Sequence, residues 1–264
     1  MLDLQNIRAF YPGFPESPDT DIQLYKEYLE MMVLDYLSSH SLIGKLTFIG
    51  GTALRLLRQI DRFSEDLDFD CKNLSQEEFA SLTDDVVCFL RRNGLPAVAK
   101  EKESDALTAF RRTIQFPQLL YDLGLSPYRE KKFVLKIEAQ DQGVDYRREM
   151  FTVNRDGFYF RIPSPSDATL YAMKLSTILH RGKGRDFYDA MFLRARSEPD
   201  MNYLSQREGI ATGEELRCRM KQVCGRTDFR LKAQDFKYLL FHPENSSRIL
   251  DFPALWEPRI QGIQ

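Results

Sequence analysis

The feature that most constrains this chain is a short run of alternating acidic and apolar residues, Asp66-Leu67-Asp68-Phe69-Asp70. Successive side chains of a β-strand point to opposite faces, so the three aspartates would share one face and the two apolar residues the other. Three carboxylates on one face repel one another. A divalent cation would relieve that repulsion, and carboxylate oxygens suit Mg²⁺ or Mn²⁺. A solvated strand without a metal is the simpler alternative, because the D-x-D pattern is common.

A glycine-rich turn precedes this acidic strand. Leu46–Ile49 predicts a short strand, and Thr52 is expected to cap a helix over residues 53–59. Gly50 and Gly51 leave room for a phosphate to approach the backbone, and the Thr52 hydroxyl and the first helical N–H groups can donate to it. By itself Gly-Gly-Thr also fits an ordinary tight turn. The order strand, Gly-Gly-Thr, helix, acidic strand favours phosphoryl transfer, which relies on positioning and charge neutralisation.

The rest of the pattern predicts an α+β fold in two lobes. Pro163 and Pro165 mark a change, because the pattern beyond them is helical. We expect an α/β lobe over residues 1–162 and a helical lobe over residues 163–264. Residues 11–20 should form a loop, and further strands are expected over residues 97–103, 107–116, 132–139 and 158–162. Further helices are expected over residues 21–39, 75–92, 166–180, 185–196, 205–207, 213–224 and 234–241. Ser75 is expected to cap the helix that ends near residue 92.

Composition places the chain among ordinary soluble proteins. It has 43% hydrophobic and 29% charged residues, and no apolar run long enough to span a bilayer. The N-terminal residues do not resemble a secretory signal. The four cysteines form no C-x-x-C pair, which favours reduced thiols in the cytoplasm over a zinc site.

Charge is unevenly distributed along the chain. The net charge is -2, but residues 171–232 contain 13 Lys/Arg against 8 Asp/Glu, so this stretch is basic and the remainder is acidic. A basic face could hold a polyanion such as RNA beside an acidic site. A solvated helical surface is the alternative interpretation.

The combination of these motifs resembles a known family. A GG[ST] turn followed by about a dozen residues and D-x-D is typical of the DNA polymerase β-like nucleotidyltransferases. The fuller string GGTALRL…RFSEDLDF resembles the AbiEii/AbiGii toxin family, with Arg55, Arg62, Ser64 and Asp66 at positions of that family's pattern. The resemblance covers about residues 22–195 and implies a polymerase β-like lobe with a mixed β-sheet, followed by a helical lobe.

The resemblance also implies roles for the first motif. Asp66 and Asp68 would hold Mg²⁺ or Mn²⁺, while Gly50, Gly51 and Thr52, together with Arg62 and Ser64, would bind the nucleoside triphosphate. A third metal carboxylate is usual in the superfamily, and Glu138, in the string VLKIEAQ with Lys136 beside it, is the candidate. Asp70 competes for this role, and Glu138 is equally well explained as an exposed strand residue.

Residues 171–193, YAMKLSTILHRGKGRDFYDAMFL, resemble the second signature of the family. By the resemblance, Lys174 would contact the triphosphate, with Arg181 on the same helix face. One of Asp186 or Asp189 would complete the active site; spacing alone does not decide between them, and we favour Asp189. A helical hairpin with surface ion pairs is the alternative for these residues taken alone.

The activity that the resemblance implies is magnesium-dependent transfer of a nucleoside monophosphate (NMP) from an NTP to an acceptor. In the toxin family the acceptor can be the 3′ end of a tRNA, and such a toxin of a type IV toxin–antitoxin or abortive-infection system would have an antitoxin encoded nearby. Two alternatives remain open. One is protein nucleotidylation on Ser, Thr or Tyr, and the other is an NTP-binding toxin or regulatory module without transferase activity. Residues 196–264 carry no recognisable motif, and we expect Phe229, Phe236, Tyr238 and Phe241 to be core residues.

Overall fold

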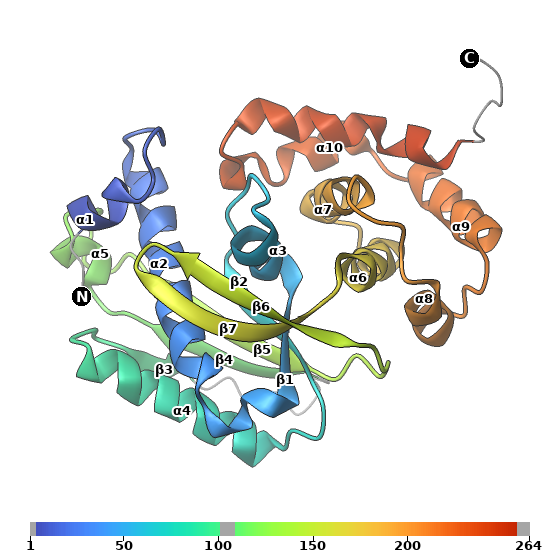
Figure 1. Cartoon of the computed structure of the whole chain (residues 1–264). Helices are drawn as coiled ribbons and strands as arrows, with labels where there is room; N and C mark the ends of the chain where they lie inside the picture. The colour runs from blue at the N-terminus through green and yellow to red at the C-terminus, as the bar shows by residue number, and fades with distance from the viewer. Residues whose placement is uncertain (1–3, 101–108, 258–264) are drawn as a thin grey trace. The chain divides into compact units, whose positions relative to one another are not determined.

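The computed structural model describes residues 4–100 and 109–257 (Figure 1). The chain forms two compact units. The first, here called the α/β unit, comprises Met1–Gln59, Phe63–Gln142 and Arg148–Ser164. The second, here called the helical unit, comprises Ile60–Arg62, Gly143–Arg147 and Pro165–Gln264. The two short segments that belong to the helical unit interrupt the stretch that we expected to form the first lobe without a break.

A five-stranded mixed sheet forms the centre of the α/β unit. Its order is β1-β2-β5-β4-β3; β2 and β5 are parallel, and the other neighbours are antiparallel. The predicted mixed sheet is therefore confirmed. Two predicted strands extend beyond the described residues, at residues 101–103 and 107–108. The five strands of the observed sheet are β1 (Leu46–Ile49), β2 (Asp66–Cys71), β3 (Val98–Lys100), β4 (Phe110–Gln115) and β5 (Val134–Gln140).

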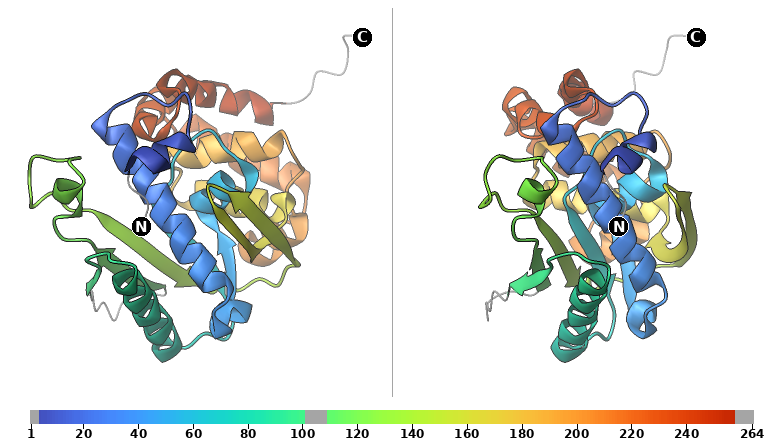
Figure 2. Two further views of the ribbon diagram at one scale, coloured as in Figure 1. Left: turned by 60° about the vertical axis from the view of Figure 1, so that its left-hand side comes forward. Right: turned by 90° about the vertical axis from the view of Figure 1, so that its left-hand side faces the viewer.

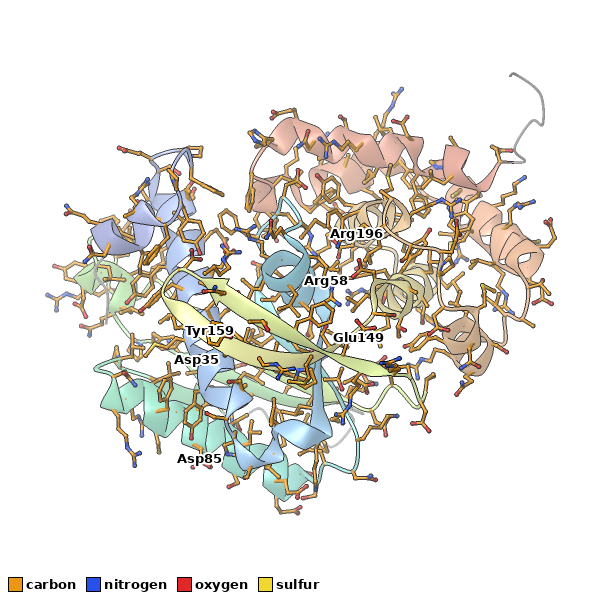
Figure 3. All side chains as sticks on the ribbon, viewed as in Figure 1. Asp35, Arg58, Asp85, Glu149, Tyr159 and Arg196 are labelled. Carbon is orange, nitrogen blue, oxygen red and sulfur yellow. The ribbon has the colours of Figure 1, made fainter. Side chains whose placement is uncertain are left out.

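A separate hairpin joins β6 (Arg148–Arg155) to β7 (Phe158–Pro165). β7 includes the strand expected over residues 158–162, whereas β6 was not predicted. The reason is that β6 is mostly exposed and polar, with Val153 as its one buried residue, so it lacks the apolar alternation that reveals a half-buried strand. Arg58 (Figure 3) lies over the Phe151 ring at 3.9 Å and donates a 2.8 Å hydrogen bond to Ser164, which ties the hairpin to α3 (Gly50–Arg58).

Helices of the α/β unit pack along its sheet. α4 contacts β3 and β4, and α2 lies beside α4 (Figure 2). Between these two helices, the ring of Tyr36 stacks on that of Phe89. The predicted Ser75 cap of α4 is confirmed as a full capping box with Glu78. The helices are α1 (Leu4–Ala9), α2 (Pro18–Ser38), η1 (Ser41–Lys45), α3 (Gly50–Arg58), α4 (Gln76–Arg92) and α5 (Leu119–Asp122).

The start of α2 differs from the prediction. The helix begins at Pro18 rather than at residue 21, because the Ser17 side chain accepts from the Thr20 N–H and proline is well suited to the first helical position. The last three residues of the expected loop over 11–20 are therefore helical.

The helical unit contains α6 (Asp167–His180), α7 (Gly184–Arg194), α8 (Met201–Glu208), α9 (Gly213–Gly225), α10 (Phe229–Gln234), η2 (Lys237–Leu239) and η3 (Pro243–Trp256). Its aromatic core includes Phe187, Phe229 and Phe252, whose rings contact one another. The expected core positions of Phe229 and Phe236 are confirmed, whereas Tyr238 is 62% exposed and that prediction is wrong.

The helix expected over residues 234–241 is also wrong. α10 starts earlier, because Asp228 accepts from the N–H groups of Arg230 and Leu231, and it ends at Gln234. Leu240 then forms an antiparallel bridge with Arg62, which requires extended backbone where a helix was expected. In the part of the chain that the structure describes, no helix combines the length and the apolar character needed to cross a bilayer.

Candidate active site

The acidic face of β2 is formed as the alternation predicted. Leu67 and Phe69 are buried on the core side, and Asp66 and Asp68 are partly exposed on the other. The parallel register with β5 places Lys136 opposite Asp66, and Glu138 opposite Asp68. Neighbours in register share a face of the sheet, so Lys136 and Glu138 extend the acidic face onto β5.

Two carboxylates of this face, those of Asp66 and Glu138, form ion pairs. Lys136 Nζ lies 3.2 Å from Asp66 Oδ1, and Arg111 Nε on β4 lies 3.2 Å from Glu138 Oε2. Both cations are half exposed, so each ion pair contributes little to stability. The role of Glu138 as a third metal carboxylate stays a prediction.

Gly50 brings α3 against the carboxylate of Asp68. Its φ is +78°, and a Cβ at this position would collide with the Asp68 side chain, so only glycine satisfies both the backbone and the space. α3 starts at Gly50 itself, and Ile49 provides no side-chain cap. The first N–H groups of α3 are therefore those of Gly50 and Gly51, at the same turn as the Asp68 carboxylate.

Thr52 is not the helix cap that the sequence analysis expected. It lies inside α3, is fully buried, and its hydroxyl donates a 2.6 Å hydrogen bond to the backbone carbonyl of Asp66. The residue therefore links α3 to the start of the acidic strand. The expectation that its hydroxyl donates to a phosphate is not supported by this geometry, since that proton is already engaged.

The residues on β2 fit a Mg²⁺ ion. Asp66 Oδ1 is buried and makes no hydrogen bond, so its contact with Lys136 is an ion pair only. Among residues 4–100 and 109–257, no three His, Cys, Asp or Glu side chains gather in a group able to hold a metal ion. A pair of carboxylates is nevertheless what Mg²⁺ commonly takes from a protein, the remaining positions being filled by water and substrate phosphates.

Asp70 is not free to act as a metal ligand. It is buried, and Oδ1 accepts a 2.9 Å hydrogen bond from the backbone N–H of Gln142. It therefore holds the end of β2 to the segment that follows β5. Of the two residues considered for the third carboxylate, Glu138 is the more accessible.

A buried ionic network around Glu27 was not foreseen. Arg55 donates to both carboxylate oxygens of Glu27, at 2.7 and 3.0 Å, and Arg155 donates to one of them at 3.0 Å. The Tyr11 hydroxyl bonds to Glu27 and to Asp156, and burial together with these carboxylates raises the pKa of Tyr11. The network fixes α3, and thus the glycine turn, to α2. Arg55 matches the family pattern, but its partner lies 28 residues earlier, beyond any local sequence signal.

Glu30 is a second buried acid on α2 that sequence reasoning missed. It is 1% exposed, and its Oε1 makes no hydrogen bond. Burial raises the pKa of Glu30 well above its ordinary value; Lys26 opposes this shift, and the charges of Glu27, Asp66 and Glu65 add to it. The available signal was a glutamate within the apolar run LEMMVL, at a position where the helix is buried on every side.

In the helical unit, Arg62, Lys174 and Asp189 form one buried cluster. Arg62 donates two 2.7 Å hydrogen bonds to Asp189, and Lys174 Nζ on α6 lies 2.7 Å from Asp189 Oδ2. Burial alone would raise the pKa of Asp189, but the two cations outweigh it and hold the pKa below its ordinary value. The Arg62–Asp189 pairing was not predicted, because 127 residues separate the two positions.

Asp186 and Asp189 take different partners on α7. Asp186 accepts from Arg181 at 3.1 Å and from the backbone N–H of Lys183 at 3.0 Å, while Lys174 Nζ is 3.9 Å away. Asp186 thus closes the first turn of α7, whereas Asp189 makes the direct contact with Lys174. Three cations and two carboxylates leave this cluster with one excess positive charge, which suits a phosphate.

The C-terminal residues support Arg62. Neighbouring Asp61 accepts from the Tyr188 hydroxyl at 2.8 Å and from the Asn245 amide at 3.1 Å, and Arg248 Nη1 lies 3.6 Å from the same carboxylate. Segment 60–62 is therefore held by α7 and η3 together. Residues 196–264, in which no motif was recognised, therefore have a structural role near Arg62.

Comparisons with known proteins bear on the family and the fold of this chain. The family model described as "Nucleotidyl transferase AbiEii toxin, Type IV TA system" matches residues 33–253. A search of curated protein sequences found no match. The nucleotidyltransferase toxin MenT4 from Mycobacterium tuberculosis is similar in structure, with a TM-score of 0.54 and 15% identity over 98% of this chain and 100% of that one. JHP933 from Helicobacter pylori gives a TM-score of 0.51 and 17% identity over 89% of this chain and 90% of the other. At these identities the likeness is one of fold.

Proposed function

Because the chain belongs to the AbiEii family of nucleotidyltransferase toxins of type IV toxin–antitoxin systems, we propose that it transfers an NMP from an NTP to RNA, with Mg²⁺ bound by Asp66 and Asp68. The observation that carries the proposal is the junction of β2 and α3. There, Asp66 has a buried oxygen that makes no hydrogen bond. Asp68, on the same face of β2, lies against Gly50, where only glycine fits.

The α/β unit would hold the metal and the phosphates. Bound Mg²⁺ would neutralise charge on the phosphates and favour attack on the α-phosphorus. Asp66 and Asp68 supply its carboxylates, and the N–H groups of Gly50 and Gly51 at the start of α3 are suited to phosphate oxygens. Thr52 would act indirectly, because its hydroxyl donates to the backbone carbonyl of Asp66 and so holds Asp66 in place.

The helical unit would supply cations for the triphosphate. Lys174 is the proposed contact. Asp189 fixes the position of Lys174 and is itself held by Arg62. Arg181, which donates to Asp186, is a further cation of this cluster. A lysine held by a buried carboxylate loses little side-chain entropy when a phosphate binds, because its rotamer is already fixed. Ser64, which precedes the acidic strand, remains a candidate nucleotide contact.

RNA is the acceptor that the charge distribution favours. The basic stretch 171–232 lies in the helical unit and can attract a phosphate backbone. We place the tRNA 3′ end there as the proposed acceptor, in the cytoplasm, with a cognate antitoxin as the proposed regulatory partner. A hydroxyl on a protein is the competing acceptor.

The test is incubation of the purified protein with Mg²⁺, each of four α-³²P-labelled NTPs and total bacterial tRNA, followed by a denaturing gel. Asp66→Ala is the inactive variant. Asp85→Ala (Figure 3) is the matched control, because it removes a half-exposed carboxylate of α4 in the same unit. Label on tRNA that requires Asp66 but not Asp85 supports the proposal.

Other outcomes assign a different function. Label on protein that requires Asp66 indicates protein nucleotidylation. No label on either acceptor, with NTP binding detectable by calorimetry, favours a binding module without transferase activity. Equal labelling by the wild type and Asp66→Ala would remove Asp66 from the site.

A further inference from the structure

The β6–β7 hairpin has one packed face and one open face. On the packed face, the ring of Phe158 contacts that of Tyr28, and Arg155 bonds to Glu27. Successive side chains of a strand point to opposite sides, so the alternate residues form the other face. All of these are exposed, and we call them the open face: Arg148, Met150, Thr152 and Asn154 on β6, and Tyr159 and Arg161 on β7.

The turn of the hairpin fixes how the two strands pair. Asp156 and Gly157 form a two-residue turn with φ values of +55° and +84°, as in the type I′ turns that join antiparallel strands. Such a turn places the residues next to it opposite each other, so Asn154 lies beside Tyr159 on the open face. Arg161 follows Tyr159 on the same face, about 7 Å further along β7. An aromatic ring and a guanidinium are therefore neighbours there.

The side chains of the open face are large and face water. Tyr159 is 72% exposed and Met150 is 51% exposed. Toward the rest of the described chain, the side chains of Tyr159 and Arg161 make no hydrogen bond, ion pair or ring contact. Aromatic residues, Met and Arg are the types that binding surfaces favour. The open face therefore has the composition of a binding surface and no internal partner for its ring or its outer arginine.

Charge selects the kind of ligand. The open face contains two arginines and no acid. Glu149 takes the alternate position of β6, at the opposite end of the hairpin from Tyr159 (Figure 3), and the carboxylate of Asp156 is already hydrogen-bonded. A positive face without a carboxylate attracts phosphate groups. RNA combines such phosphates with bases that stack on exposed aromatic rings.

We propose that the open face binds unpaired nucleotides of the RNA acceptor, with a base stacked on Tyr159 and a neighbouring phosphate paired with Arg161. The inference rests on the proposed function for its choice of RNA, and it adds a contact in the α/β unit to the basic stretch of the helical unit. Unpaired nucleotides are required because a base inside a double helix has no free face to offer. Arg148 adds positive charge, but its guanidinium is already bonded to the Gly44 carbonyl at 2.8 Å.

A protein partner is the competing occupant, since the same residue types suit protein interfaces. The two occupants differ in their response to salt. Each phosphate contact with single-stranded RNA contributes about 0.7 to the slope of log affinity against log salt, because counterions are released. Under our proposal, Arg161→Gln therefore lowers both the affinity for RNA and this slope.

The experiment measures binding of a fluorescein-labelled oligouridine of about 12 nucleotides to the full chain by fluorescence anisotropy. EDTA is present and NTP is omitted, so that neither metal binding nor transfer affects the result. Tyr159→Thr removes the ring and keeps a residue suited to a strand, whereas Tyr159→Phe keeps the ring. Tyr128→Thr is the matched control, because Tyr128 is a 67% exposed tyrosine of the same unit outside the hairpin. Melting temperatures confirm that each variant is folded.

We expect Tyr159→Thr to weaken binding by about tenfold, and Tyr159→Phe to stay within about twofold of the wild type. Arg161→Gln should weaken binding and lower the salt slope by about 0.7, and Tyr128→Thr should bind as the wild type does. Wild-type affinity in both Tyr159→Thr and Arg161→Gln would overturn the inference, leave the RNA acceptor standing and assign the open face to a protein partner. An equal loss in Tyr128→Thr would also overturn it. Absence of RNA binding by the wild type at low salt would overturn the RNA acceptor, and the inference with it.

Discussion

Arg62 and Asp189 form a bidentate ion pair with two 2.7 Å hydrogen bonds, and neither side chain is more than 1% exposed. Removing one member of such a pair leaves the other charged and buried, which typically costs about 3 kcal/mol or more. The pair therefore fixes segment 60–62 in the helical unit as well as orienting Asp189 toward Lys174.

We expect Arg62→Lys to lower the free energy of unfolding by about 3 kcal/mol, because an ammonium cannot reproduce the two parallel bonds of the guanidinium. Urea unfolding followed by circular dichroism measures the change. Arg196→Lys (Figure 3) is the matched control: Arg196 pairs with Asp167 at 2.7 Å but is 43% exposed, so its loss should be within about 1 kcal/mol. Equal losses in the two variants would contradict the structural role of the buried pair.

Asp189 should also make stability depend on pH. Because its folded pKa lies below its unfolded value of about 4, its contribution is complete above that value and is lost as the pH falls through the folded pKa. Between pH 6 and pH 3 the melting temperature of the wild type should therefore fall more steeply than that of Asp189→Asn. Parallel curves for the two proteins would show that Asp189 is not stabilised as a carboxylate.

Local signals made much of the α/β unit predictable. β1 has the predicted bounds and β2 contains the whole predicted acidic run, because the alternation of the run and the flanking glycines are contained in a few residues. The Ser75 cap was equally visible, since a capping box spans only four positions. Asp66, Asp68 and Lys174 could be proposed from motifs for the same reason.

Contacts between distant residues were not predictable from one sequence. Arg62 bonds to Asp189, and Arg155 to Glu27, across more than 120 positions of the chain. The prediction that Thr52 caps the helix was wrong for a different reason. Its residue type suits a helix cap, but α3 already begins two residues earlier, at Gly50, so the Thr52 hydroxyl lies inside the helix and bonds to the Asp66 carbonyl. Local propensity gave way there to tertiary packing.

Gly50→Ala should lower the free energy of unfolding by more than backbone strain alone accounts for. Gly50 and Gly94 have nearly equal φ values of +78° and +80°, but an added Cβ meets Asp68 only at Gly50. Gly94→Ala should cost about 1 kcal/mol from the left-handed backbone. Gly50→Ala should cost more and should also weaken Mn²⁺ binding, because the Asp68 carboxylate must move.

Melting temperatures and Mn²⁺ titrations of the two alanine variants give the comparison. The difference between the variants isolates the contact with Asp68, since the backbone strain is common to both. If Gly50→Ala bound Mn²⁺ as the wild type does, Asp68 would not be a ligand in the position seen here.

Thr52→Val distinguishes the two roles considered for the Thr52 hydroxyl. In the structure that hydroxyl bonds to the Asp66 carbonyl, so its replacement by a methyl group should lower the free energy of unfolding by about 1–3 kcal/mol. It should also lower kcat, because Asp66 loses a support. Thr52→Ser retains the hydroxyl and should recover most of the activity. Urea unfolding and steady-state kinetics with varied NTP provide both readouts. A Thr52→Val protein with wild-type stability and a raised KM for the NTP would instead show that the hydroxyl serves the phosphate, which the sequence alone had suggested.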